Sequence, residues 1–324
     1  MKILITGGAG YLGSVLIEHL FNTTPNIEKI TVYDSLMYNQ TSLIHYSWRK
    51  NFEFVYGDVR NHQKLSQYVN EADVIIPLAA IVGFPACDRD KDLATAVNYT
   101  HVKFICDKIS GTDKKIVYPN TNSGYGIGEN GECTELSPLN PISHYGVTKV
   151  NAEREVLAVG GISIRLATVF GSSPRMRMDL LVNEFVYKAL TDKYITIFEK
   201  NFVRNYIHIR DVANTFEYML NNYDKFKGEV FNVGLSDANL SKAQLVEKIQ
   251  EYVPDFAITY SDYYEDPDKR DYVVSNKKLE DTGWTPKYSL DDGIVELIKT
   301  YTILIQDLSS KYRNGFPLGY GTRT

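Results

Sequence analysis

The feature that most constrains the fold is a strand, a glycine-rich turn, a helix and a second strand within the first 34 residues. The apolar run 2–5 leads into TGGAGYLG at residues 6–13, and an apolar helical stretch follows. Gly8 is expected to permit the tight turn, Gly10 to let the backbone approach a pyrophosphate, and Gly13 to let the helix pack closely on the strand. The free N–H groups and partial positive charge at the helix start would face that diphosphate.

The second predicted strand, 29–34, ends at an acid, Asp34, about twenty residues beyond Gly13. At this spacing an acid accepts both ribose hydroxyls of a dinucleotide, and its charge repels a 2′-phosphate. The segment 35–38 contains no arginine that would offset that charge. The sequence therefore predicts NAD rather than NADP, and a turn without a ligand is the less favoured alternative. The predicted cofactor contacts here are Gly7, Gly10, Tyr11, Leu12, Gly13 and Asp34.

The alternation of apolar strands and amphipathic helices predicts an α/β fold with a doubly wound parallel (Rossmann) sheet and a smaller mixed α/β substrate-binding lobe. Strands are expected at 2–6, 29–34, 52–56, 73–79, 115–119 and 162–166, and helices at 98–109, 145–159 and 242–252. We expect an NAD-binding domain at 1–170, to which about 204–235 returns, a substrate lobe mainly at 171–312, and a loose tail at 313–324.

Composition excludes several classes of protein. The 324 residues carry a formal net charge of −5 without a dense basic tract, so no nucleic-acid partner is expected. Cys87, Cys106 and Cys133 form neither an even framework nor a CxxC pair, which is typical of a reducing compartment, and no metal site is expected. The sequence shows no leader pattern and no apolar run of about 18 residues. We therefore expect a soluble cytoplasmic protein without a membrane segment.

A tyrosine and a lysine suggest the chemistry. Tyr145 and Lys149 are four residues apart, so a helix would place them on the same face. A lysine beside a tyrosine is expected to lower the pKa of the phenol. Such a tyrosine can take the proton of a hydroxyl while hydride leaves the carbon for a nicotinamide. A YxxxK spacing also occurs by chance on solvated helices, but its place after a complete dinucleotide motif favours catalysis.

With these motifs the chain resembles the extended short-chain dehydrogenase/reductase superfamily, specifically its nucleotide-sugar epimerase/dehydratase branch, up to about residue 305. The resemblance implies a third catalytic residue before the YxxxK helix, and Thr121 in YPNTNSGYG takes that position. Its hydroxyl would hydrogen-bond the reacting sugar oxygen. The resemblance also implies cofactor contacts by Tyr145, Lys149 and a further group: Asp58 (to the adenine amine), Val59, Leu78, Ala79, Ala80 and Asn98.

The same resemblance implies substrate-binding residues in the second lobe. Asn183 in LVNEF matches a substrate-binding asparagine, and Arg204 in RNYIHIRDVA matches an arginine that holds the substrate's diphosphate. Arg270 matches a second such arginine. Two guanidinium groups suit paired phosphate oxygens better than lysines do. Surface salt bridges to Asp211 and Asp271 remain the alternative.

The catalytic loop discriminates among the reactions of this branch. Nucleotide-sugar 4,6-dehydratases carry an Asp-Glu pair after the threonine, whereas this chain has Asn122 and Ser123, which cannot exchange protons usefully near neutral pH. The 3,5-epimerases carry a cysteine at the position of Ser123. The remaining expectation is oxidation of the sugar 4-hydroxyl, either as the end point or as the first half of a 4-epimerisation. Asn122 and Ser123 are then expected to contact the substrate.

Three strings, at 118–129, 173–183 and 266–272, resemble bacterial GDP-heptose 4-dehydrogenases of capsule biosynthesis. That narrower resemblance implies a GDP-linked heptose and a tightly held nicotinamide, recycled by a small 2-keto acid. Arg175 and Arg177 could bind such an anion, and a solvated basic loop is the alternative. A catalytically idle NAD-binding scaffold is the competing hypothesis, which the presence of all three catalytic residues disfavours.

Similar enzymes form dimers through the helices that correspond to those beginning near Asn98 and Tyr145. A homodimer or homotetramer is therefore expected. Apolar residues at helical spacing fit such an interface, although core packing also explains them. These residues are Val102, Ile105, Val150 and Val156.

Binding of NAD in preference to NADP is the first testable prediction. Asp34→Ala should narrow the preference, because the substitution removes the charge that repels a 2′-phosphate. Calorimetric titration of both cofactors measures the ratio. Equal affinities of the unmodified protein for the two cofactors would contradict the assignment.

Overall fold

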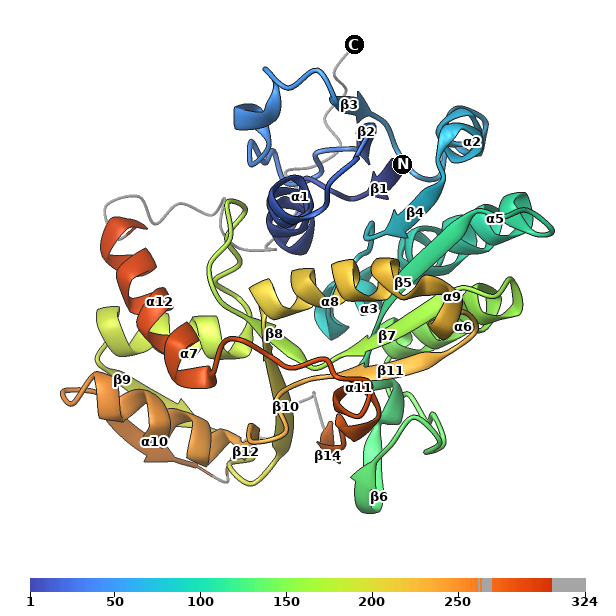
Figure 1. Ribbon diagram of the computed structural model, residues 1–324. Coiled ribbons are helices and arrows are strands. Elements are labelled where there is room, and N and C mark those ends of the chain that lie inside the picture. The colour runs from blue at the N-terminus through green and yellow to red at the C-terminus, as the bar shows by residue number, and fades with distance from the viewer. Residues whose placement is uncertain (262, 264–269, 305–324) are drawn as a thin grey trace.

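A parallel sheet in the order β11-β7-β5-β4-β1-β2-β3 forms the centre of the computed structural model, which describes residues 1–261, 263 and 270–304 (Figure 1). This order confirms the predicted doubly wound sheet. Its crossover lies between β1 and β4, where ligands of such sheets bind beyond the carboxyl ends of the strands. The strands are β1 (Lys2–Thr6), β2 (Lys29–Asp34), β3 (Phe52–Tyr56), β4 (Val74–Pro77), β5 (Lys115–Thr121), β7 (Ile162–Leu166) and β11 (Val230–Val233).

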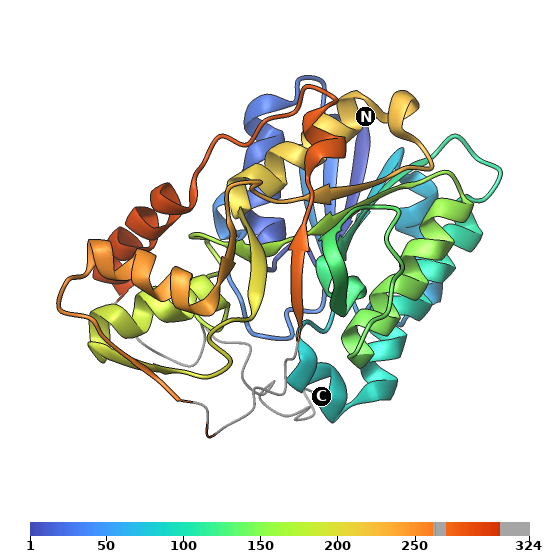
Figure 2. The same cartoon turned by 90° about the horizontal axis from the view of Figure 1, so that it is seen from below.

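Helices cover both faces of the sheet. Alternate residues of β1 pack into two separate clusters, Ile3 and Ile5 on one face and Leu4 on the other. Apolar strands of this kind are buried on both sides. Figure 2 shows α1 (Tyr11–Thr23) and α8 (Ile209–Asn221) along one face. The opposite face carries α2 (His62–Glu71), α3 (Phe84–Arg89), α4 (Lys91–Thr95), a π-helical turn (Ala96–Thr100), α5 (His101–Ile109) and α6 (His144–Ala158).

The second lobe is a mixed α/β assembly. Strand β10 (Val203–His208) lies between β8 (Thr168–Phe170) and β12 (Asn239–Ser241). Two parallel pairs complete its strands: β9 (Tyr194–Ile197) with β13 (Ala257–Tyr260), and β6 (Ile127–Cys133) with β14 (Asp271–Val274). The remaining elements of the described chain are distributed over both lobes: α7 (Leu181–Thr191), α9 (Tyr223–Phe226), α10 (Lys242–Tyr252), α11 (Lys277–Glu280), α12 (Leu290–Leu304) and 3₁₀ turns at Ile44–Tyr46 and Asn122–Tyr125.

Several boundaries of the predicted strands and domains differ in the structure. The expected strand 73–79 ends at Pro77, whereas the expected strand 115–119 continues to Thr121. Within the segment 204–235, α8 and α9 pack on the main sheet and β11 joins it, whereas β10 pairs with β8 and β12. The predicted tail, 313–324, lies outside the described residues.

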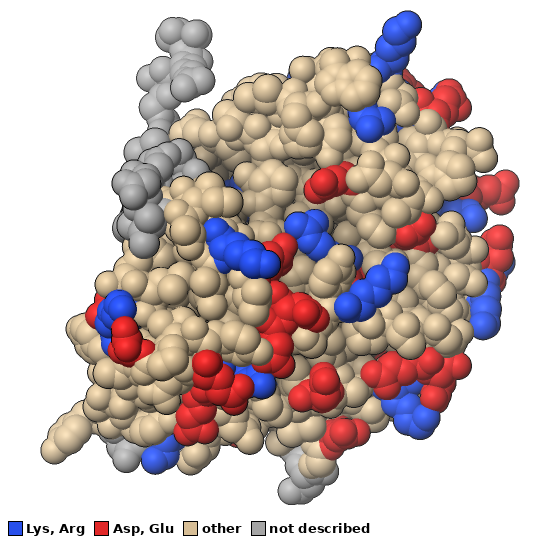
Figure 3. Space-filling model, turned by 60° about the vertical axis from the view of Figure 1, so that its left-hand side comes forward, with Lys and Arg blue, Asp and Glu red and all other residues tan. Residues whose placement is uncertain are grey.

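The four apolar residues assigned to a dimer face lie in the interior of the chain. Val102, Ile105, Val150 and Val156 are all buried, so core packing explains them. Between α5 and α6 the surface instead carries polar contacts, in which the Tyr99 hydroxyl donates to Glu155 at 2.9 Å. The homodimer or homotetramer stays a prediction without support from these residues. On the face shown in Figure 3, acidic and basic side chains are interspersed. Within the described part of the chain, no helix is long and apolar enough to cross a membrane.

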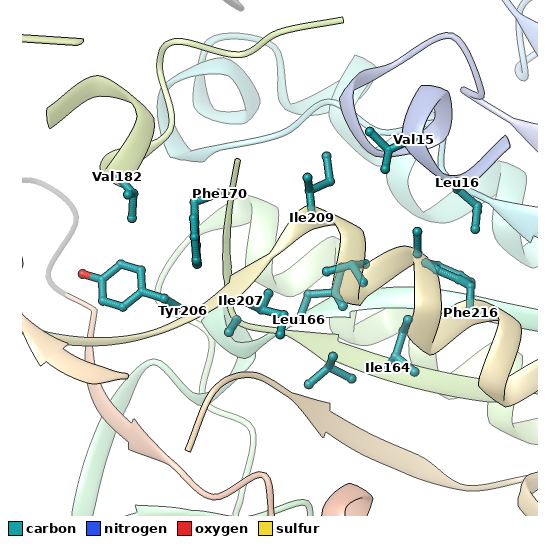
Figure 4. Close-up of a cluster of buried hydrophobic side chains, with 14 of the residues drawn as sticks. Val15, Leu16, Ile164, Leu166, Phe170, Val182, Tyr206, Ile207, Ile209 and Phe216 are labelled. Carbon is teal, nitrogen blue, oxygen red and sulfur yellow. The ribbon is translucent and has the colours of Figure 1, made fainter. Parts of the chain in front are cut away.

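One continuous core joins the two lobes. In Figure 4, Leu16 of α1, Ile164 of β7 and Phe216 of α8 belong to the same cluster as Val182 of α7 and Tyr206 of β10. All five side chains are buried. The second lobe is therefore packed on the first through shared apolar side chains, and we expect both to unfold together.

Phe216→Ala should lower the free energy of unfolding by about 3–5 kcal/mol, because it opens a cavity where α8 packs on the sheet. Urea unfolding followed by circular dichroism measures this loss. Phe54→Ala, at a side chain that is 37% exposed, is the matched control with a loss below about 1 kcal/mol. Two separate transitions in the unmodified protein would contradict a shared core.

Candidate active site

The glycine-rich turn after β1 has the geometry of a dinucleotide site, with one correction. The left-handed backbone occurs at Gly7 (φ +70°), not at Gly8, so Gly7 makes the tight turn. A Cβ at Gly7 would come within 2.5 Å of the Ala79 nitrogen. At Gly13 a Cβ would lie 2.5 Å from the Gly8 oxygen, so the helix packs on the turn itself. Glycine at both positions lets three backbone segments approach closely.

The start of α1 and Asp34 fit a bound dinucleotide. Gly10 is the N-cap of α1, so the first-turn N–H groups have no N-cap side chain to satisfy them and can receive a pyrophosphate. The Asp34 carboxylate accepts hydrogen bonds from the Ala9 nitrogen at 3.0 Å and the Leu36 nitrogen at 2.8 Å. It is thereby fixed beside the turn, where its remaining lone pairs can receive ribose hydroxyls.

The other predicted cofactor residues lie near this turn, in differing roles. The Leu78 nitrogen donates to the Thr6 oxygen at 2.9 Å, which places Leu78–Ala80 against Gly7. Val59 is buried in the core. Asp58 is paired with Arg60 at 2.6 Å. Although partial burial opposes it, this partner holds the pKa of Asp58 below its ordinary value. Its contact with adenine stays a prediction.

Asn98 acts on the site through the backbone. Its amide oxygen accepts from the Ile81 nitrogen at 2.8 Å, and its amide nitrogen donates to the Ile81 oxygen at 3.0 Å. The same nitrogen lies 3.3 Å from the Thr148 hydroxyl of α6. Asn98 is fully buried, so it fixes the loop after β4 to the catalytic helix rather than being exposed to a cofactor.

The catalytic helix begins against the catalytic loop. The Ser143 hydroxyl caps α6 by accepting from the Gly146 nitrogen at 3.1 Å, which places Tyr145 in the first turn. A Cβ at Gly146 would be 3.4 Å from the Ser123 oxygen, so helix and loop touch. Thr121 is the last residue of β5, and its hydroxyl donates to the Ser123 hydroxyl at 2.9 Å. The fold therefore brings the predicted catalytic elements together.

The pKa values of Tyr145 and Lys149 differ from those that their spacing predicted. Burial raises the pKa of Tyr145 to about 12, and the positive charges of Arg270 and Arg177 are the influences that oppose this rise. Lys149 is itself buried, which lowers its pKa to about 7. Its ammonium lies 4.0 Å from the centre of the Tyr118 ring. The expectation that Lys149 lowers the pKa of the tyrosine was wrong for this arrangement, because burial removes much of the lysine's tendency to stay charged.

A buried polar network around Glu153 holds these elements in place. Glu153 is two helical turns after Tyr145 and one turn after Lys149, on the same face of α6. Its carboxylate accepts from Arg165 of β7 at 2.7 Å, from the Ser163 hydroxyl at 2.6 Å and from the Asn120 amide at 2.7 Å. Asn120 directly precedes Thr121 in β5. The network therefore joins the catalytic strand to the catalytic helix.

The network extends to the second lobe. Arg165 donates to the Tyr125 hydroxyl at 3.0 Å, and Tyr125 donates to the Asn232 amide oxygen at 2.6 Å. The Asn232 amide nitrogen donates to the Ser275 oxygen at 3.0 Å, just beyond β14. Although burial opposes it, the hydrogen bonds to Arg165, Asn120 and Ser163 hold the pKa of Glu153 below its ordinary value.

Two predicted substrate residues lie in the catalytic loop. Asn122 is buried, and neither polar atom of its side chain has a hydrogen-bond partner among the described residues. Ser123 accepts hydrogen bonds from Thr121 and from Arg270. The predicted diphosphate-binding Arg270 thus reaches the catalytic loop itself, where its charge also acts on Tyr145.

Arg204, near the start of β10, lies beside β14. Its guanidinium carbon is 5.5 Å from the centre of the Tyr272 ring, and the start of β14 is fixed to β10 by a 2.8 Å hydrogen bond from the Val203 nitrogen to Asp271. Of the two acids considered as surface salt-bridge partners, Asp271 accepts this hydrogen bond, and Asp211 accepts from the backbone nitrogens of Lys287 and Tyr288. The two arginines therefore come from the adjoining ends of β10 and β14, and their joint binding of a diphosphate stays a prediction.

The remaining substrate predictions change with the structure. Asn183 is fully buried, and its amide accepts from the Gly171 nitrogen at 3.1 Å and donates to the Arg177 oxygen at 2.8 Å. It holds a loop, and these bonds do not support substrate contact. Arg177 makes two hydrogen bonds to Asp179, at 2.7 and 3.1 Å. Arg175 lies over Tyr38, near Asp34, which is the cofactor side of the site.

Comparison with known families agrees with this geometry. The profile of the NAD dependent epimerase/dehydratase family matches residues 3–234. The chain belongs to this family. It is an enzyme whose cofactor is NAD, and the turn, the helix start and the acid described above are the groups that fit that cofactor.

The proteins that are similar to this family member are named for different functions. It is 27% identical to the low-salt glycan biosynthesis protein Agl12 of Haloferax volcanii, over 93% of this chain and 98% of that protein. It is 29% identical to a trifunctional UDP-glucose 4,6-dehydratase, 3,5-epimerase and reductase of Arabidopsis thaliana, of which it spans 47%, and 93% of this chain is covered. In fold it is similar to a UDP-glucuronic acid 4-epimerase of Bacillus cereus, with a TM-score of 0.84 and 23% identity over 94% of this chain and all of that one.

Sequence reasoning missed the Glu153 network, although two signals were present. Arg165 is a charged residue within the apolar strand ISIRL, and Glu153 continues the helical face of Tyr145 and Lys149. A charge within a buried strand requires a buried partner. Only the packing of β5, β7 and α6 shows that the two residues meet.

Glu153→Gln should destabilise the family member by about 3–5 kcal/mol, because it leaves Arg165 buried without a counter-charge. Glu155→Gln, on the same helix but with a side chain that is 28% exposed, is the control, with a loss below about 1 kcal/mol. Urea unfolding at pH 7 measures both losses. A Glu153→Gln variant as stable as the control would contradict the role of the network.

Lys149→Met should change how stability depends on pH. The pKa of Lys149 is about 7 in the fold, against an ordinary value of 10.5. Between these values the unfolded chain binds a proton that the folded chain does not, so this lysine makes stability rise with pH. Nucleotide-free Lys149→Met should be more stable than the unmodified protein at pH 7, with the gap closing toward pH 10. A gap that is constant with pH in thermal unfolding would contradict a neutral buried lysine.

Proposed function

We propose that this protein oxidises the 4-hydroxyl of a nucleotide-activated sugar with NAD, as the end point or as the first half of a 4-epimerisation. The observation that carries the proposal is the catalytic loop, in which Thr121 is followed by Asn122 and Ser123 and lies against the start of the Tyr145 helix. Thr121, Tyr145 and Lys149 with bound NAD suffice for oxidation, because that reaction removes one proton, for which Tyr145 is the base, and one hydride, for which the cofactor is the acceptor.

In the proposed reaction, Thr121 and Tyr145 both contact the 4-oxygen of the sugar. Tyr145 acts as the base in its deprotonated, phenolate form and removes the hydroxyl proton, and bound NAD would supply the acceptor for the hydride of C4. Burial favours the neutral phenol, so the proton acceptor depends on nearby positive charge from Arg270 and Arg177. The Thr121 hydroxyl hydrogen-bonds the oxygen as negative charge develops. Arg204 and Arg270 hold the diphosphate, which orients C4 toward the cofactor.

Loss of water needs more than this site supplies. A 4,6-dehydratase must protonate the leaving 6-hydroxyl and remove the proton on C5. The Asn122 amide exchanges no proton near neutral pH, and the Ser123 hydroxyl is hydrogen-bonded to Arg270 and Thr121. Relatives named as dehydratases therefore share the scaffold, and the loop favours a different reaction.

Within this proposal, a GDP-linked heptose of a capsule pathway is the narrower substrate assignment, supported by the three resembling strings in the sequence. A 4-epimerase remains the second candidate, because oxidation at C4 is also its first step. A separate 2-keto acid is needed only if the ketone is released, since an epimerase returns the hydride to C4. Product analysis separates the two.

Tyr145→Phe should lower kcat by about 10²–10⁴-fold, because it removes the proton acceptor. Nucleotide-sugar binding should be nearly unchanged, since Arg204 and Arg270 still hold the diphosphate. A panel of GDP-, UDP- and dTDP-sugars in thermal-shift assays identifies the substrate, and mass spectrometry identifies the product. A product that has lost two hydrogens, or one with unchanged mass and inverted C4, supports the proposal. A product lighter by one water contradicts it.

A further inference from the structure

The buried ammonium of Lys149 lies against the face of an aromatic ring. Its Nζ atom is 4.0 Å from the centre of the Tyr118 ring. Tyr118 is fully buried, and Lys149 is only 4% exposed. Among the residues that the structure describes, none forms a hydrogen bond or an ion pair with this ammonium. The ring is therefore the direct partner that the fold supplies for a cation in its interior.

The register of β5 against α6 brings the ring to the lysine. Tyr118 and Asn120 are alternate residues of β5, so their side chains lie on the same face of the strand. Lys149 and Glu153 are four residues apart and share a face of α6. Asn120 donates to Glu153 at 2.7 Å, and one step back along both elements Tyr118 meets Lys149. The Tyr118 hydroxyl also donates to the Lys149 carbonyl oxygen at 3.5 Å, which helps to fix the ring beside the helix.

The other titratable groups around the ammonium are neutral or paired elsewhere. The Glu153 carboxylate is occupied by the three hydrogen bonds of its own network. Burial raises the pKa of the Cys87 thiol to about 11 and lowers the pKa of the His101 imidazole to about 3, so both are neutral at pH 7. Tyr145 is neutral there as well, since burial raises its pKa to about 12. The ring face is thus the group in contact that opposes the burial of the charge.

We propose that Tyr118 is a positioning residue, whose ring face keeps the Lys149 ammonium charged and in place without cancelling its charge. The face of an aromatic ring carries negative partial charge and attracts a cation within about 6 Å of its centre, most strongly where water is excluded. The ring itself has no net charge, because burial raises the pKa of its hydroxyl above the ordinary value. A carboxylate in the same place would cancel the positive field of the lysine, whereas the ring leaves it to act on Tyr145.

The catalytic consequence rests on the proposed oxidation, in which the phenolate of Tyr145 is the base. The charged form of Lys149 favours that phenolate. Loss of the ring should therefore slow the transfer of hydride. The affinity for the nucleotide sugar should stay the same, since none of its predicted contacts involves Tyr118.

The test changes the charge distribution of the ring at nearly constant shape. Tyr118→Phe is made with ordinary phenylalanine and with its difluoro and trifluoro analogues, because ring fluorines draw negative charge away from the face. Tyr118→Leu removes the face. Tyr223→Leu is the matched control, because it removes another buried ring that contacts β5, through the Ile116 nitrogen.

Two readouts separate the contact from its consequence. The first is a carbon-13 NMR titration of nucleotide-free protein labelled at lysine Cε, with Lys149→Met to assign the signal. It needs no substrate. The second is the single-turnover rate of NADH formation at pH 7, with the nucleotide sugar that thermal shift selects, together with the affinity for that sugar.

The pKa of Lys149 should fall stepwise along the fluorine series and be lowest in Tyr118→Leu, by about one unit, a tenfold loss of proton affinity. Tyr118→Phe and Tyr223→Leu should leave it nearly unchanged. The single-turnover rate should fall in the same order, with the affinity for the sugar unchanged. Should Tyr118→Leu fail to fold, the fluorine series decides the question.

A pKa of Lys149 that stays constant along the fluorine series would overturn the proposal, as would an equal fall in Tyr223→Leu. Parallel losses of rate and of sugar affinity would overturn the positioning role, because they would indicate general damage to the site. A product lighter by one water contradicts the proposed oxidation alone, since the titration measures the ring and the lysine without substrate.

Discussion

The buried ion pair between Glu153 and Arg165 is the interaction on which the rest of the site depends. Two charges inside a protein are costly, and the cost is offset here because the carboxylate accepts from three side chains at once. Those partners come from β5 and β7, while Glu153 comes from α6. The pair thereby fixes the distance between the strand that ends at Thr121 and the helix that begins beside Tyr145. A charge in the core is thus used for position, and the reacting groups take their geometry from it.

A second set of contacts holds the two lobes together. The apolar core runs from α1 to α7, and above it Tyr11, Ser173 and Asn183 fasten the segment 171–183 to the first turn of α1. The glycine-rich end of the Rossmann sheet is therefore built partly from the second lobe. Arg270 provides the corresponding link on the substrate side, where it reaches Ser123 of the catalytic loop. The first turn of α1 and the catalytic loop are therefore each contacted by groups from both halves of the chain.

Local patterns predicted the parts of the fold that depend on local chemistry. Apolar runs gave the strands, and the acid at the end of β2 lies beside the turn as its spacing required. The tight turn was assigned to Gly8 but is made by Gly7, because two adjacent glycines cannot be distinguished until their backbone angles are known. Burial also escaped prediction, so the neutral tendency of Lys149 and the role of Asn183 as a loop anchor were missed. Nothing in its own segment indicates that Arg175 lies beside Tyr38 and near Asp34.

The central claim is that the site oxidises C4 and expels no water. The most direct measurement uses the nucleotide sugar selected by thermal shift, labelled with deuterium at C4 and with oxygen-18 at C6, and follows both labels by mass spectrometry. The account predicts that deuterium moves from C4 to the nicotinamide. It stays there if the ketone is released, and it returns to C4 if the sugar is epimerised. In both cases the oxygen-18 stays in the sugar. Loss of the oxygen-18 from the product, with deuterium appearing at C6, would contradict it.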